Sequence, residues 1–126
     1  MLKQILYWTF TALLAIWLLV GGFFDVTHAA PAIAILRKLG YPDYLATILG
    51  VAKLLAIPVL VYPKAGRLRE WAYAGVTFDA LGAFFSHLAV KDGLSETIAP
   101  LIFLAFAVVS YLLWRLPAPR SAPESR

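Results

Sequence analysis

Four long apolar runs, separated by short polar segments, divide the chain. They lie at about residues 4–24, 44–62, 71–90 and 97–114. A helix that crosses a bilayer needs about 17 to 25 mostly apolar residues, and each run has this length. Backbone groups in lipid must be hydrogen-bonded within their own segment, so isolated runs predict helices; a barrel needs about eight strands or more. The pattern therefore predicts an all-α integral membrane four-helix bundle over residues 1–116.

Two shorter segments complete the predicted organisation. Residues 32–39 are apolar on one side and are followed by Gly40-Tyr41-Pro42, which predicts a short helix that lies on the outer surface or caps the bundle. Residues 117–126 are rich in proline, serine and charge and predict a disordered cytoplasmic tail. Lys3 ahead of the first run leaves a cleaved signal peptide open, but the apolar run is longer than such a peptide requires.

Composition supports a membrane protein and excludes several kinds of chemistry. Hydrophobic residues make up 62% of the chain and charged residues only 14%, and the mean hydropathy is +0.80. There is no cysteine, so disulfides, thiolate metal sites and thiol redox motifs are excluded. The net charge of +4 comes from residues beside apolar runs, a membrane-flank pattern that argues against nucleic-acid binding.

The distribution of basic residues predicts the orientation in the membrane. If the N-terminus is inside, the inner segments carry seven Lys and Arg residues: Lys3, Lys64, Arg67, Arg69, Arg115, Arg120 and Arg126. The outer segments then carry only Arg37, Lys38 and Lys91. Because basic residues concentrate on the cytoplasmic side of membrane proteins, both termini are predicted to be cytoplasmic.

Two charged residues fall inside the apolar runs, where charge is costly. Lys53 lies near the middle of the second run and Asp79 near the middle of the third. Each such charge costs about 2.5 to 3.5 kcal/mol on insertion scales. The two runs are antiparallel neighbours, and both residues lie at similar depth, so a direct Lys53–Asp79 ion pair is predicted. The pair is either a structural brace or the floor of a pocket.

Small residues follow the same helix face as the charges. Gly75 and Gly82 share a stripe with Asp79, and Gly50 precedes Lys53 by one turn. The pattern is typical of tight helix packing and also suits a pocket with a polar centre.

A second polar group is predicted at the outer end of the bundle. Asp25 and His28 end the first run, and Ser86 and His87 end the third, so all four are expected at the mouth of a pocket above Lys53 and Asp79. They are compatible with a proton relay or a ligand-orienting cluster. Two histidines and a carboxylate also match a metal site by residue type alone, which is weak support, and no metal is assigned.

Several of these positions occur together in one known family. The chain carries Gly40-Tyr41-Pro42, then Gly50 and Lys53, then Glu70-Trp71-Ala72-Tyr73-Ala74-Gly75, Phe78-Asp79, Gly82-Ala83 and Ser86-His87. Over roughly residues 5–114 it resembles the DoxX-like family. The resemblance implies a small four-helix protein of the bacterial cytoplasmic membrane. Some related proteins are associated with membrane oxidoreductases, quinone-linked ones among them, but this role cannot be carried over residue by residue.

Three functional hypotheses remain open from the sequence. The leading one is a membrane subunit or binding module that accepts a lipid, a quinone or a partner oxidoreductase, with Lys53, Asp79, Ser86, His87, Asp25 and His28 as candidate ligand contacts. The second is an enzyme that transfers protons on an apolar substrate, and the third is a small proton-coupled transporter. No cofactor other than a quinone or lipid is suggested, and a homo-oligomer stays compatible with the sequence.

Overall fold

The computed structural model describes residues 1–116, which form five helices. They are α1 (Leu2–Val26), α2 (Ala30–Lys38), α3 (Tyr44–Val61), α4 (Arg67–Ala89) and α5 (Leu94–Arg115). The prediction of an all-α fold is confirmed, and α2 is the short helix expected between the first two runs. The predicted disordered tail lies outside the described residues.

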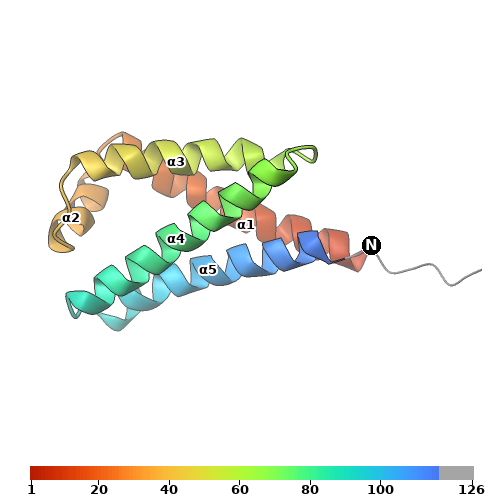
Figure 1. Cartoon of the computed structure of the whole chain (residues 1–126). Coiled ribbons are helices and arrows are strands. Elements are labelled where there is room, and N and C mark those ends of the chain that lie inside the picture. The colour runs from red at the N-terminus through yellow and green to blue at the C-terminus, as the bar shows by residue number, and fades with distance from the viewer. Residues whose placement is uncertain (117–126) are drawn as a thin grey trace, which may run out of the picture.

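The four long helices lie lengthwise against one another, and α2 lies across one end (Figure 1). α1 packs against both α3 and α5, and α4 packs mainly against α5. α3 and α4 are close at the loop that joins them and diverge toward α2, which gives the pair the outline of a V (Figure 1). The start of α1, the end of α5 and the α3–α4 loop all lie at the end opposite α2.

Local sequence explains where the helices begin and end. Pro31 lies in the first turn of α2, where its missing N–H is not needed. Gly40, after α2, has a φ of +87°, and Gly66, before α4, has a φ of +56°. Residues other than glycine rarely adopt such φ angles. These two glycines therefore allow the chain to reverse direction.

The core is a band of apolar side chains in the middle of the bundle. Its buried members come from all four long helices: Leu14, Leu18, Leu60, Tyr73, Val76, Ala80, Phe103 and Ala107. Outside it, large apolar side chains are exposed on every long helix, among them Ile16, Leu55, Phe78, Phe85 and Leu112. Such a surface is unfavourable in water and suits contact with lipid tails.

Three of the helices are long and apolar enough to cross a membrane: α1, α3 and α5. α4, the third of the four predicted spans, is not among them. It has 23 residues, so length is not the reason. Its arginines, Glu70, Asp79 and His87 make it more polar than the other three.

A buried hydrogen-bonded group ties three helices together. The Ser110 hydroxyl of α5 lies 2.7 Å from the Thr11 hydroxyl of α1 and 2.6 Å from the Tyr73 hydroxyl of α4. Thr11 and Ser110 have no exposed surface, and Tyr73 is 4% exposed. Because these hydroxyls are buried, each depends on the others for its hydrogen bonds.

We expect Ser110→Ala to lower the free energy of unfolding by about 1 to 3 kcal/mol, because it leaves two buried hydroxyls without their partner. Thr9→Ala is the matched control. The Thr9 hydroxyl is exposed and bonds only to the Ile5 carbonyl of its own helix, 2.7 Å away. Unfolding in detergent, followed by tryptophan fluorescence, measures both variants. Equal stability of the two variants would contradict the role given to Ser110.

Candidate ligand cleft and its ion-pair cluster

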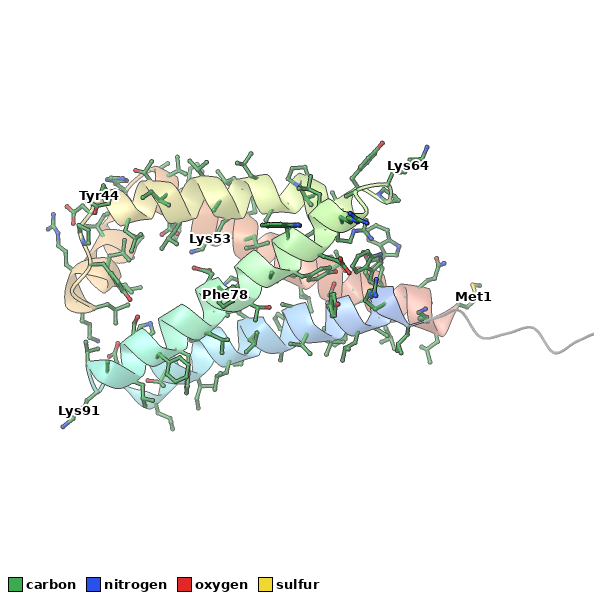
Figure 2. The ribbon with its side chains drawn as sticks, in the orientation of Figure 1. Met1, Tyr44, Lys53, Lys64, Phe78 and Lys91 are labelled. Carbon is green, nitrogen blue, oxygen red and sulfur yellow. The ribbon has the colours of Figure 1, made fainter. Side chains whose placement is uncertain are left out.

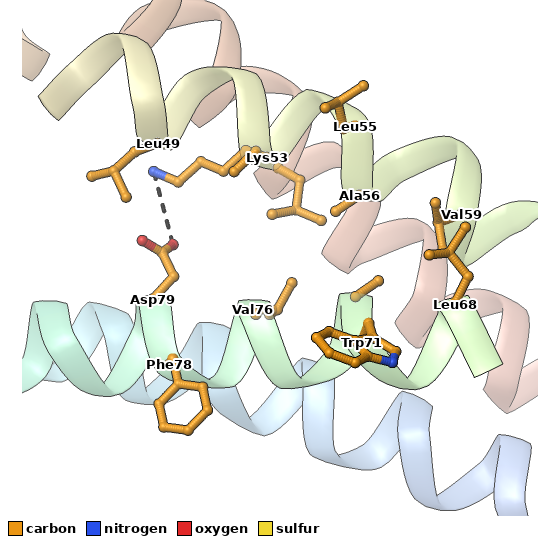
Figure 3. Close-up of a pocket in the computed structure, with 14 residues that line it drawn as sticks. Leu49, Lys53, Leu55, Ala56, Val59, Leu68, Trp71, Val76, Phe78 and Asp79 are labelled. Carbon is orange, nitrogen blue, oxygen red and sulfur yellow. Dashed lines mark ion pairs between the residues drawn. The ribbon is translucent and has the colours of Figure 1, made fainter. Parts of the chain in front are cut away.

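A cleft of about 570 Å³ lies between α3 and α4. Lys53 and Asp79 are its ionisable lining residues, and the rest of the lining is aliphatic or aromatic side chains, alanine and glycine. Lys53 and Asp79 point toward each other across the space between the two helices (Figure 3). The cleft therefore combines apolar walls with one polar position, the usual form of a small-molecule site.

Lys53 makes two ionic contacts rather than one. Its Nζ lies 3.9 Å from Oδ2 of Asp79, so the predicted ion pair is present. The shorter contact, 2.7 Å, is a hydrogen bond from Nζ to Oδ2 of Asp25 on α1. The side chains of Lys53, Asp25 and Asp79 are 20%, 12% and 24% exposed. One cation thus lies between two carboxylates in a largely buried position.

Asp25 is bonded to Lys53 and not to His28, Ser86 or His87, the residues with which it was expected to group. The end of α1 packs directly on α3 one turn before Lys53, since a Cβ on Gly50 would come within 2.7 Å of the Val26 nitrogen and 2.9 Å of the Asp25 Cβ. Side chains on a helix lean toward its N-terminus, so the Lys53 stem runs from α3 toward the end of α1. It passes over Gly21, where an added Cβ would lie 3.8 Å from Nζ. This lean brings the ammonium to Asp25.

The glycines of α4 do not form the tight packing that their stripe indicated. An added Cβ on Gly75 or Gly82 would meet no atom within 4 Å, whereas Gly50 is in close contact with α1. Gly75 lines the cleft. The close helix approach is therefore between α1 and α3, and the small residues of α4 leave open space.

The other predicted site residues have separate partners at the α2 end. Nε2 of His28 lies 2.7 Å from the Thr47 hydroxyl on α3, and the Ser86 hydroxyl lies 2.6 Å from the Tyr41 hydroxyl. Nδ1 of His87 donates to Asp92, at 2.7 Å. Within residues 1–116, no hydrogen bond or ion pair joins His28 to His87, and none of these residues lines the cleft. Their role as ligand contacts remains a prediction.

Asp92 organises this end of the molecule, and the sequence analysis did not single it out. Its carboxylate accepts hydrogen bonds from Lys38 of α2, from the His87 ring and, at 2.9 Å, from the Gly93 N–H. The side chain of Asp92 is 4% exposed although it lies in the α4–α5 loop. The sequence signal that could have identified Asp92 is an acidic residue five positions after a histidine and immediately before a glycine. Together with the hydrogen bond between Tyr41 and Ser86, these contacts hold α2 in place at the end where α3 and α4 diverge.

The contacts of Asp92 predict an acid-dependent loss of stability. The hydrogen bond from Lys38, followed by that from His87, lowers the pKa of Asp92 from an ordinary 3.8 to about 2. A carboxyl whose pKa is lowered by folding stabilises the protein above its unfolded pKa and loses that effect as pH falls through its folded pKa. The melting temperature of the protein should therefore exceed that of Asp92→Asn at pH 7, and the difference should vanish between about pH 4 and pH 2.

Asp43→Asn is the control for this comparison. Asp43 pairs with Arg37 on the surface at 2.6 Å, and the two side chains are 43% and 68% exposed. Exposed pairs contribute little, so this variant should melt close to the parent protein at pH 7. A difference between the parent and Asp92→Asn that persists unchanged at pH 2 would contradict the assignment.

No group of three or more His, Cys, Asp or Glu side chains within residues 1–116 is arranged to hold a metal ion. Asp25, His28 and His87, which match a metal site by type, are bonded to Lys53, Thr47 and Asp92 instead.

The helical fold, the apolar exterior and the candidate spans define a transmembrane protein with a polar cluster inside its helix packing. The chain belongs to the DoxX-like family, whose model matches residues 9–110. That range contains α2, α3 and α4 entire, together with Asp25, Lys53 and Asp79. No curated protein and no solved structure matches the chain.

Proposed function

We propose that this protein is a membrane-embedded binding module whose α3–α4 cleft accepts an apolar ligand with a polar head, a quinone or a lipid, from the bilayer. The observation that carries the proposal is the cleft of about 570 Å³, apolar except for Lys53 and Asp79. Sites for small molecules commonly measure about 300 to 1,000 Å³. The Lys53 ammonium has three N–H groups and can bond to a ligand oxygen while it holds Asp25.

A multi-pass arrangement with α1, α3, α4 and α5 as spans is part of the proposal. α4 is long enough, at about 35 Å for its 23 residues, and its Asp79 faces Lys53 (Figure 3). Met1 and Lys64 lie at one end of the molecule, and Tyr44 and Lys91 lie at the other (Figure 2). The excess of basic residues at the Met1 end supports cytoplasmic termini in a bacterial cytoplasmic membrane.

Cysteine labelling tests this orientation. The chain has no cysteine, so Lys64→Cys and Lys91→Cys each introduce a single reactive thiol. In intact cells a membrane-impermeant maleimide should label Lys91→Cys and leave Lys64→Cys unlabelled until the cells are opened. The reverse pattern would overturn the orientation.

A cleft-filling substitution tests ligand binding. Gly75→Leu adds a large side chain at a residue that lines the cleft, and its Cβ meets no atom within 4 Å. Gly82→Leu is the matched control, since Gly82 is equally unobstructed and does not line the cleft. Quinones and lipids that co-purify with each variant are extracted and identified by mass spectrometry.

We expect one quinone or lipid to co-purify with the parent protein and with Gly82→Leu and to be lost from Gly75→Leu. Equal amounts in both variants would mean that the molecule binds elsewhere. Recovery of bulk membrane lipid alone, with no enrichment, would contradict the proposal.

A further inference from the structure

A second cavity, of about 500 Å³, lies at the Met1 end of the molecule, away from the α3–α4 cleft. Its polar lining comes from Lys3, Gln4 and Tyr7 of α1 and from Arg69 of α4, and Trp8 and Trp114 form aromatic walls. None of the described residues that line it is acidic. The described side chains that line the cavity therefore carry two positive charges, on Lys3 and Arg69, and no negative one.

Arg69 is buried there without a negative partner among residues 1–116. It is 4% exposed, and its NH1 donates to the Tyr7 hydroxyl at 3.1 Å and its NH2 to the carbonyl of Tyr62. Both acceptors are uncharged. Its Nε is buried and has no hydrogen-bond partner within the described chain, and no carboxylate there forms a salt bridge with it. A buried guanidinium normally has a counter-anion, because an uncompensated charge is costly to bury.

The neighbours of Arg69 hold the guanidinium in place rather than neutralise it. Its Cζ lies 5.1 Å from the centroid of the Trp114 ring, a cation–π contact. The bond to Tyr62 satisfies one of the free carbonyls at the end of α3. Lys3 donates to the carbonyl of Leu116 and keeps two further N–H groups. Both cations thus retain capacity for an anion in the cavity.

We propose that this cavity binds the phosphate group of an anionic phospholipid. Arginine and lysine together suit a phosphate, and basic cavities between helices on the cytoplasmic side recognise such head groups. Trp8 and Trp114 are typical of the head-group level of a bilayer. Leu113 of α5 also lines the cavity and offers apolar surface for an acyl chain. The inference relies on the proposed membrane orientation but not on a ligand in the α3–α4 cleft.

Lys3→Gln tests the site, with Lys64→Gln as its matched control. Both remove one positive charge from the same end of the molecule, but Lys64 is exposed in the α3–α4 loop and does not line the cavity. Dioleoylphosphatidylglycerol is added to the protein in a neutral detergent, and bound lipid is counted by native mass spectrometry. Phosphatidylcholine and inorganic phosphate are run in parallel.

We expect phosphatidylglycerol to bind more tightly than phosphatidylcholine and to lose about fivefold in affinity in Lys3→Gln, since each basic residue near an anionic membrane surface contributes that much. Lys64→Gln should bind like the parent. Arg69→Lys, checked for folding by circular dichroism, should also bind more weakly, because lysine keeps the charge but not the planar set of donors.

If Lys3→Gln and Lys64→Gln lose the same affinity for phosphatidylglycerol, the lipid responds only to surface charge in general. That result would overturn the site. Equal affinity for phosphatidylcholine would overturn the anionic head group. Displacement of the lipid by millimolar inorganic phosphate would assign the cavity to free phosphate and overturn the lipid as its ligand. None of these outcomes depends on what co-purifies in the α3–α4 cleft, so the two proposals fail independently.

Discussion

Lys53→Leu will lower the free energy of unfolding by about 3 to 5 kcal/mol, because it leaves two carboxylates buried without their cation. Asp25 and Asp79 both contact Lys53, at 2.7 and 3.9 Å. The shorter contact is also the less exposed one, since Asp25 is 12% and Asp79 24% exposed. We therefore expect Lys53 to be coupled more strongly to Asp25 than to Asp79.

Two double-mutant cycles measure these couplings. Lys53→Leu is combined with Asp25→Leu in one cycle and with Asp79→Leu in the other, and unfolding is followed in detergent. The double variant with Asp25→Leu should recover more stability than the one with Asp79→Leu. The exposed Arg37–Asp43 pair is the control, and its coupling should be below about 1 kcal/mol. A larger coupling to Asp79 would show that the longer contact dominates.

Gly50→Ala will destabilise the protein by about 1 to 3 kcal/mol or more, because a side chain at this position overpacks the contact between α1 and α3. The added Cβ would lie 2.6 Å from Cγ2 of Val26 and 2.7 Å from its backbone nitrogen. The backbone contact cannot be relieved by a rotamer change, so the helices must separate. Asp25 adjoins this contact, and its coupling to Lys53 should fall with it.

Gly75→Ala is the matched control, since it makes the same chemical change within a helix and meets no neighbouring atom. Alanine favours a helix over glycine by about 1 kcal/mol, so this variant should be at least as stable as the parent. Melting temperatures of both variants test the comparison. A Gly50→Ala protein as stable as Gly75→Ala would refute the close approach of α1 and α3.

The sequence by itself determined the helical fold, the membrane environment and the presence of a polar cluster. Runs of about 20 apolar residues can satisfy their backbone in lipid only as helices, so the fold class follows from composition and length alone. The need of Lys53 for a carboxylate follows likewise from the cost of a charge in the bilayer. Even α2 was predictable, because its apolar side and the glycine that follows it are local signals.

Only the tertiary structure decided which groups meet. The sequence identified the neighbour of Lys53 by depth along each run, and depth cannot show that the end of α1 lies against Gly50. That approach, together with the lean of the lysine stem, brings Asp25 to Lys53. The partners of His87 and Arg69 could not be predicted from depth along a run either. Asp92, the partner of His87, lies in a loop, and Tyr7, the partner of Arg69, lies on another helix. Pattern along the chain reports which face a residue occupies, whereas the neighbour on that face depends on how the helices cross.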